Sequence, residues 1–164
     1  GEKGLKERFT GSDLYPILTA RALENNWSCF FFGHSRKILD FISVRHPRLK
    51  IAGVHEGYNF KTNEVIDKIN KVNPDILIIG LSCPIQEQWI SENKDKIKFK
   101  VALLVGDGIK IFAGKKIRGP VILRNMGLEW VTRYFTNPVQ NFRKYVFGVP
   151  LFILRTLNAK IKSK

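Results

Sequence analysis

Short apolar runs alternate with amphipathic stretches through most of the chain. Four apolar runs, at residues 28–32, 49–54, 76–80 and 101–105, predict β-strands. The run at 76–80 is continuous, with Leu81 behind it, which is typical of a strand buried on both faces of a parallel sheet. Apolar spacing of three to four residues predicts helices after Ser12, after Ser35, over 62–73 and over about 86–97. The pattern predicts an α/β fold, a Rossmann-like parallel sheet with helices on both faces.

Charge is distributed unevenly and suggests a second part of the chain. Residues 1–108 hold 16 Lys/Arg and 13 Asp/Glu, whereas residues 109–164 hold 12 Lys/Arg and one acid, Glu129. Aromatic residues interleave with these basic ones, a combination that serves membrane interfaces or single-stranded nucleic acid. We therefore divide the chain into a core, residues 1–120, and a basic, aromatic, helical C-terminal appendage, residues 121–164, that we expect to associate with a membrane.

Several classes of site are not indicated by the sequence. No apolar run approaches the length of about 20 residues that spans a bilayer. Cys29, in a predicted strand, and Cys83, in a predicted loop, give no disulfide framework, and His34, His46 and His55 show no metal-ligand spacing. The chain has no dinucleotide fingerprint, no P-loop and no Asp-x-Asp pair. We expect a cytoplasmic protein that needs neither a metal ion nor another cofactor.

The stretch at residues 76–89, ILIIGLSCPIQEQW, predicts a strand, a loop and the start of a helix. Open α/β sheets bind ligands at loops of this kind, outside the carboxyl ends of the strands. A helix start offers free backbone N–H groups, which suit a phosphate. In an alternative interpretation, Gln86 and Glu87 merely form a first helical turn.

Four blocks of this sequence resemble signatures of the WecG/TagA/CpsF glycosyltransferases. They are ERFTGSDL, GLSCPIQEQWI, VGDGIKIFAGKKIRGP and GLEWVTRYFTNPVQNFRKY, and together they cover nearly all of the chain. The chain departs from the family pattern at Lys110, where the family has Asp, at Ile111, where it has Phe, and at Gln140, where a basic residue is usual.

The resemblance implies an inverting transfer of a sugar, of the N-acetylmannosamine type or a related hexose, from a UDP-sugar. The implied acceptor is an undecaprenyl-diphosphate-linked sugar, in polysaccharide or teichoic acid synthesis for the bacterial cell envelope. Arg8 is then expected to meet the donor diphosphate, because arginine offers several hydrogen-bond donors without losing its charge. Gln86 is expected to bond donor or acceptor, and Arg133 and Arg143 to complete the site. The expected donor site comprises Arg8, Thr10, Gly33, Gly80, Gln86, Gly106 and Asp107.

The resemblance also implies that the catalytic base is an Asp in an upstream segment that this sequence does not include. We therefore expect slow turnover by this chain alone. The expected location is the inner face of the cell membrane, as a peripheral protein on anionic lipid, with homo-oligomers possible. A second hypothesis is a non-catalytic or truncated lipid-binding relative. A third, a nucleic-acid-binding module, is disfavoured by the four blocks, so we expect no nucleic acid partner.

Overall fold

The computed structural model of the protein describes residues 10–115 together with residues 155 and 156. The chain divides into two compact units, Gly1–Ile117 and Arg118–Lys164, and residues 10–115 belong to the first of them. The predicted site residues Arg8, Arg133 and Arg143 lie outside the described residues, as does nearly all of the predicted appendage.

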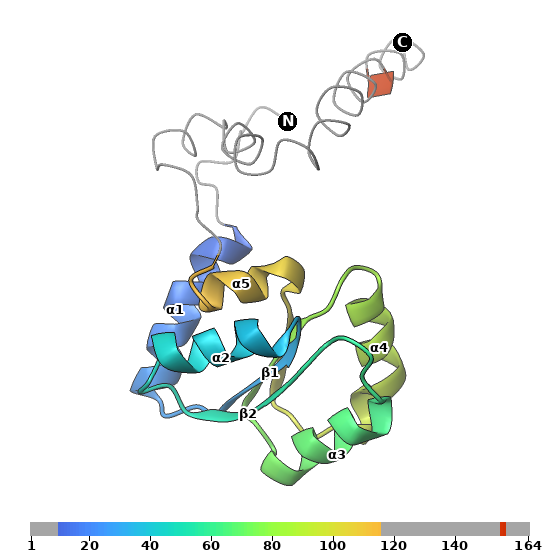
Figure 1. The fold of residues 1–164 in the computed structure, drawn as a ribbon, viewed down its shortest axis with the longest axis horizontal. Coiled ribbons are helices and arrows are strands. Elements are labelled where there is room, and N and C mark those ends of the chain that lie inside the picture. The colour runs from blue at the N-terminus through green and yellow to red at the C-terminus, as the bar shows by residue number, and fades with distance from the viewer. Residues whose placement is uncertain (1–9, 116–154, 157–164) are drawn as a thin grey trace, which may run out of the picture. The chain divides into compact units, whose positions relative to one another are not determined.

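A four-stranded parallel sheet forms the centre of the first unit (Figure 1). Its strands are β1 (Cys29–Gly33), β2 (Ile51–His55), β3 (Ile76–Gly80) and β4 (Val101–Leu104), in the spatial order β2-β1-β3-β4. The chain thus proceeds from β1 to β2 on one side and returns to place β3 on the other. The point where the strand order reverses lies between β1 and β3, which is where open α/β sheets bind ligands.

Five helices accompany the sheet in the described part of the chain: α1 (Gly11–Glu24), α2 (Arg36–Arg45), α3 (Thr62–Val72), α4 (Ile85–Asn93) and the short α5 (Ile109–Phe112). Alternate strand residues face opposite sides of the sheet. Cys29 and Phe31 of β1 pack with α1, α2 and α5, whereas Phe30 and Phe32 pack with α3 and α4. The predicted α/β architecture, with helices on both faces of a parallel sheet, is therefore confirmed.

The predicted start of the first helix is wrong, because the N-cap is Thr10 rather than Ser12. The Asp13 carboxylate accepts hydrogen bonds from the Thr10 backbone N–H at 2.9 Å and from the Thr10 hydroxyl at 2.6 Å. Thr10 and Asp13, three positions apart, form a capping box, in which each side chain bonds the backbone of the other residue and fixes the first turn of the helix. Ser35 does occupy the N-cap of α2, as predicted. The predicted helix over 86–97 is shorter, because α4 ends at Asn93 and a 3-10 turn comes next.

A polar network fixes the amino ends of three adjacent strands. Asp75, which precedes β3, accepts hydrogen bonds from the Ser28 N–H and hydroxyl, both at 2.8 Å, and pairs with the Lys100 ammonium at 2.6 Å. Ser28 precedes β1 and Lys100 precedes β4. The hydrogen bond from Lys100, followed by those from Ser28, holds the pKa of the Asp75 carboxyl well below its usual range. Asp75 is therefore ionised at neutral pH and ties the three strand starts together.

Candidate functional site

Glycines bring β1 and β3 into close backbone contact at their carboxyl ends. Gly33 has a φ of +132°, and a Cβ placed there would lie 2.8 Å from the Cα of Gly80. A Cβ on Gly80 would in turn lie 2.8 Å from the Cβ of Ile109, the first residue of α5. No larger residue fits either position without movement of the neighbouring backbone or of the buried Ile109. Gly33 and Gly80, both predicted donor-site residues, therefore lie where the strand order reverses. Their contacts in the structure are with each other and with Ile109, and serve close packing.

Gln86 connects the start of α4 to the loop after β4. Its side chain is 6% exposed. Its Oε1 accepts a hydrogen bond from the Gly106 N–H at 3.0 Å, and its Nε2 donates to Glu87 Oε1 at 2.8 Å. Gly106 has a φ of +52°, in the left-handed region that glycine adopts without strain. Gln86 therefore holds the Gly106–Gly108 turn, which carries Asp107, against the first turn of α4.

The Glu87 carboxylate is a weak proton acceptor. The pKa of this carboxyl is lowered, first by the hydrogen bond from Gln86 and next by the backbone N–H of Glu87 itself. Both interactions favour the ionised form, because they stabilise negative charge on the carboxylate oxygens. Such a group accepts a proton less readily than an unperturbed carboxylate, so Glu87 is poorly suited to act as a general base.

His34 comes directly after β1 and presents a hydrogen-bond donor at the carboxyl edge of the sheet. Its backbone is in the left-handed region, with a φ of +58°. Its Nδ1 accepts a hydrogen bond from the Ser35 N–H at 2.8 Å, so the neutral ring carries its proton on Nε2. Burial lowers the pKa of His34, and the nearby Lys110 charge lowers it further, while Asp107 opposes the shift. The lowered pKa favours the neutral ring at pH 7, in which the N–H donor is at Nε2.

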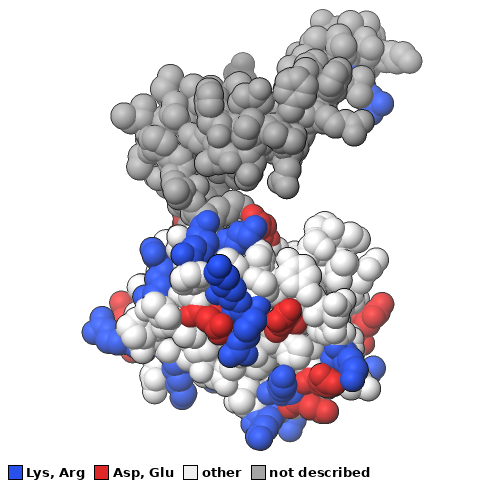
Figure 2. Space-filling model, in the orientation of Figure 1, with Lys and Arg blue, Asp and Glu red and all other residues white. Residues whose placement is uncertain are grey.

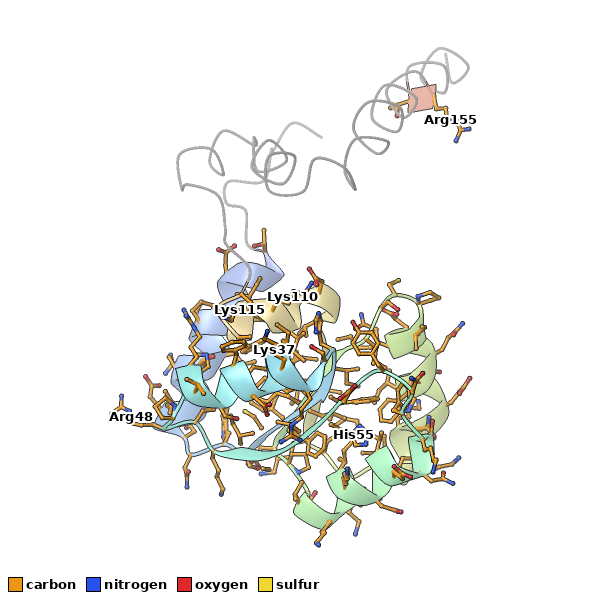
Figure 3. All side chains as sticks on the ribbon, in the orientation of Figure 1. Lys37, Arg48, His55, Lys110, Lys115 and Arg155 are labelled. Carbon is orange, nitrogen blue, oxygen red and sulfur yellow. The ribbon has the colours of Figure 1, made fainter. Side chains whose placement is uncertain are left out.

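Side chains from the segments that follow β2 and β4 lie near His34. Lys110 pairs with Asp107 at 2.7 Å, and the charges of both residues act on the His34 ring. The exposed Tyr58 ring lies 6.1 Å from that ring, centre to centre, and the Gly57 N–H donates to the His34 carbonyl at 2.9 Å. We call His34, Tyr58, Asp107 and Lys110 the switch-point cluster, because these residues come after β1, β2 and β4 at the carboxyl edge. Lys110 is labelled on α5 in Figure 3.

The structure brings most of the described, predicted donor residues to this edge. Gly33, Gly80, Gln86, Gly106 and Asp107 all lie there. Thr10 is the N-cap of α1, and the hydroxyl of Tyr15 on that helix contacts Gly108, so the start of α1 approaches the same turn. Sequence reasoning missed His34, Tyr58 and Lys110 as site residues. The available signals were the position of His34 directly after a predicted strand and the basic residue that replaces the family's Asp at Lys110.

A separate apolar cavity of about 270 Å³ lies near the amino ends of β3 and β4, away from the switch-point cluster. Leu18, Trp27 and Val101 are among the residues that line it, and its polar lining residues are the paired Asp75 and Lys100. The cavity lining is mainly apolar and its cation is held by Asp75, so it offers a phosphate fewer donors than the switch-point cluster, which has the His34 Nε2–H besides Lys110. Within residues 10–115 and 155–156, no group of His, Cys, Asp and Glu side chains could hold a metal ion. No helix in that part of the chain is long and apolar enough to cross a membrane.

The parallel sheet, with polar side chains at its carboxyl edge, defines an open α/β protein, a class that binds ligands where the strand order reverses. A model of the glycosyl transferase WecG/TagA/CpsF family matches residues 2–164, and the chain belongs to this family. Similar proteins include two from Staphylococcus aureus, which are 27% (strain MRSA252) and 26% (strain NCTC 8325 / PS 47) identical over 164 residues. Both are named N-acetylglucosaminyldiphosphoundecaprenol N-acetyl-beta-D-mannosaminyltransferase. Each match covers 98% of this chain but 64% of the relative, so the chain spans less than two thirds of their length.

Proposed function

We propose that this chain is the donor-binding core of a glycosyltransferase that moves an N-acetylmannosamine-type sugar from a UDP-sugar to an undecaprenyl-diphosphate-linked N-acetylglucosamine. The observation that carries the proposal is the family match over residues 2–164, with relatives named as N-acetyl-beta-D-mannosaminyltransferases of N-acetylglucosaminyldiphosphoundecaprenol; the UDP-sugar donor is part of our proposal. The position of the switch-point cluster supports it, because a nucleotide sugar is the kind of ligand that open α/β sheets bind there.

In the proposed reaction, an acceptor hydroxyl attacks the anomeric carbon of the donor and passes its proton to a general base, for which the family resemblance implies an Asp that this sequence does not include. The bond from that carbon to the diphosphate oxygen breaks, and UDP leaves with the electron pair. The Nε2–H of His34 and the ammonium of Lys110 are donors suited to the negative oxygens of the leaving diphosphate. Arg8, in the arginine-bearing sequence block, is the third proposed donor, so that the diphosphate is held without a metal ion. The Tyr58 ring offers an exposed aromatic face for the base or the sugar.

Calorimetry with UDP, UMP and uridine in the presence of a chelator tests the donor site. We expect UDP to bind more tightly than UMP or uridine, because each additional charge-assisted contact contributes about 1.5–3 kcal/mol. Arg8→Ala and Lys110→Ala should each weaken UDP binding by roughly tenfold or more on that basis. Lys68→Ala, on the exposed side of α3, is the control and should leave UDP affinity unchanged. Equal affinity for UDP and uridine, or a strict need for Mg²⁺, would refute the proposed donor site.

We further propose that the 164-residue chain turns over slowly by itself. Asp107 is paired with Lys110, and the pKa of Glu87 is lowered, so both carboxylates are weak general bases. Loss of general-base assistance costs about 10²–10⁴ in rate. The test compares the chain with a version extended upstream by native in-frame sequence, using UDP-N-acetylmannosamine and a lipid-diphosphate acceptor. Full activity of the 164-residue chain would contradict the proposal and would make Asp107→Asn the next measurement.

The alternative, a non-catalytic lipid-binding relative, makes a different prediction for the same two versions of the chain and the same acceptor. It requires binding of the lipid-diphosphate acceptor without transfer in either version of the chain.

We also propose peripheral attachment to anionic membrane through residues 121–164, whose basic and aromatic composition suits the lipid interface. Sedimentation with vesicles should show binding that added salt weakens. Equal binding to neutral and anionic vesicles would argue against this electrostatic attachment.

A further inference from the structure

Cations gather along one side of α2 and around the end of α5. Lys37, Phe41 and Arg45 are spaced four residues apart on α2, which places them on the same side of the helix. The Lys115 ammonium lies 3.5 Å from the centre of the Phe41 ring. Arg45 packs at the end of α5, where a Cβ placed on Gly114 would lie 2.9 Å from the Arg45 Cζ. We call Lys37, Phe41, Arg45 and Lys115 the α2–α5 basic face, and Lys and Arg side chains gather over these helices in Figure 2.

The charge of this face is not balanced by nearby acids in the described part of the chain. The neighbouring cations are paired: Arg36 with Asp40 at 3.0 Å and Lys110 with Asp107 at 2.7 Å. Lys37, Arg45 and Lys115, by contrast, are exposed and have no ion pair within residues 10–115. Three uncompensated positive charges therefore remain on one surface, where they attract an anionic partner.

One end of the α2–α5 basic face, at Lys37, lies near the candidate site. At its last residue along the chain, Lys115, the chain continues into the strongly basic residues 116–164. α2 starts just after β1, so Lys37, in its first turn, lies near the carboxyl edge of the sheet (Figure 3). Lys115 leads directly into residues 116–164, which hold ten Lys/Arg and one acid, Glu129. A surface that attracts the α2–α5 basic face therefore also attracts the basic segment after it, and lies near the carboxyl edge of the sheet at Lys37.

We propose that the α2–α5 basic face lies on the anionic headgroups of a lipid bilayer, which places the carboxyl edge of the sheet, beside Lys37, close to the membrane surface. The inference rests on the proposed membrane-linked acceptor. Lipid is favoured over single-stranded nucleic acid because nucleic acid needs free aromatic faces for base stacking. The aromatic ring of this face, Phe41, is half-buried and covered by Lys115. The remaining exposed groups are cations, which adsorb to headgroups without insertion.

The test measures vesicle binding of the complete 164-residue chain, with phosphatidylcholine vesicles that contain or lack phosphatidylglycerol. The face variant is K37E/R45E/K115E. The matched control is K68E/K71E/K98E, which changes net charge equally at exposed residues on and near α3, across the sheet. Removal of each cation should reduce binding to the anionic vesicles about fivefold, so the face variant should lose roughly 100-fold or more. The control variant should lose less than tenfold.

Several outcomes would overturn the inference. Equal losses in the face and control variants would show that only net charge matters. Unchanged binding of the face variant would show that residues 116–164 bind alone. A face variant that keeps vesicle binding but loses single-stranded RNA binding would assign the face to nucleic acid. The neutral variant K37Q/R45Q/K115Q, checked by thermal unfolding, should show a smaller loss of the same kind, which separates charge from misfolding.

Vesicle binding needs no turnover, so it separates this inference from the proposed reaction. If the chain binds anionic vesicles through the face but neither it nor its extended version transfers sugar, the inference stands and the proposed function fails. Transfer to a short-chain, water-soluble acceptor should be equal in the chain with and without K37E/R45E/K115E. A loss of that transfer at normal stability would place the face in the donor or acceptor site instead, and would overturn the lipid assignment.

Discussion

Replacement of Gly33 by alanine should destabilise the protein strongly, because two independent costs meet at this position. The φ of +132° is a conformation that L-residues rarely adopt, and holding alanine there costs about 1–3 kcal/mol. The added Cβ also meets the backbone of Gly80, which cannot rotate away as a side chain can. Overpacking of this kind costs about 1–3 kcal/mol. The sum, about 2–6 kcal/mol, is a large part of the 5–15 kcal/mol typical of a whole domain.

Urea unfolding monitored by tryptophan fluorescence measures this cost. At an m-value of about 1–3 kcal/mol/M, the unfolding midpoint of Gly33→Ala should fall by roughly 1 M or more. Gly11→Ala is the matched control, because Gly11 lies in the first turn of α1 and its nearest neighbour, the Tyr15 hydroxyl, is 3.3 Å from the added Cβ. Its unfolding free energy should change by less than about 1 kcal/mol. A Gly33→Ala variant of normal stability that has lost UDP affinity would refute the packing argument and assign Gly33 to donor contact.

Three further substitutions test other parts of the fold. Because the folded pKa of Asp75 is depressed, its stabilising effect is complete above the unfolded pKa of about 3.9 and is lost as the pH falls below it. Asp75→Asn should therefore lower the thermal midpoint at pH 7 and make its decline between pH 5 and about pH 2 shallower; parallel pH profiles would contradict this. Gln86→Ala leaves the Gly106 N–H without its partner and should cost about 1–3 kcal/mol in urea unfolding. Ile78→Ala, in the buried centre of β3, should cost about 2–5 kcal/mol, and a loss below 1 kcal/mol would contradict the described core.

The sequence predicts the sheet well because strand burial is recorded directly in residue type. All five residues of β3 are buried, as the continuous apolar run at 76–80 indicates. The predicted ends of the strands are less accurate, because buried apolar residues also lie just outside the strands. The apolar run at 49–54 includes Leu49 in a strand, but Leu49 precedes β2 and is buried at 7% exposure. Apolar character reports burial, whereas the ends of a strand are set by backbone hydrogen bonds that the pattern does not contain.

The site is only partly predictable, because its geometry depends on strand order. Asp107 and Gln86 follow predicted strands in the sequence, and this position correctly places them at the carboxyl edge of the sheet. Sequence position alone cannot predict that the Lys110 charge acts on His34, since the two residues are near each other only because β1 lies next to β3, and β3 next to β4. Alternation of strands and helices is compatible with other orders. The predicted roles of Arg8, Arg133 and Arg143 stay predictions, because these residues lie outside the described part of the chain.

The Asp75 network and the switch-point cluster lie at opposite ends of the same strands. Parallel strands make this separation unavoidable, because all their starts share one edge of the sheet and all their ends share the other. Substitutions at the two edges share no partner, so their free-energy effects should add. With the donor site where we propose it, such a protein can change ligand preference through its carboxyl-end loops while Ser28, Asp75 and Lys100 keep the fold intact. Substrate specificity and thermal tolerance can therefore evolve separately in this chain.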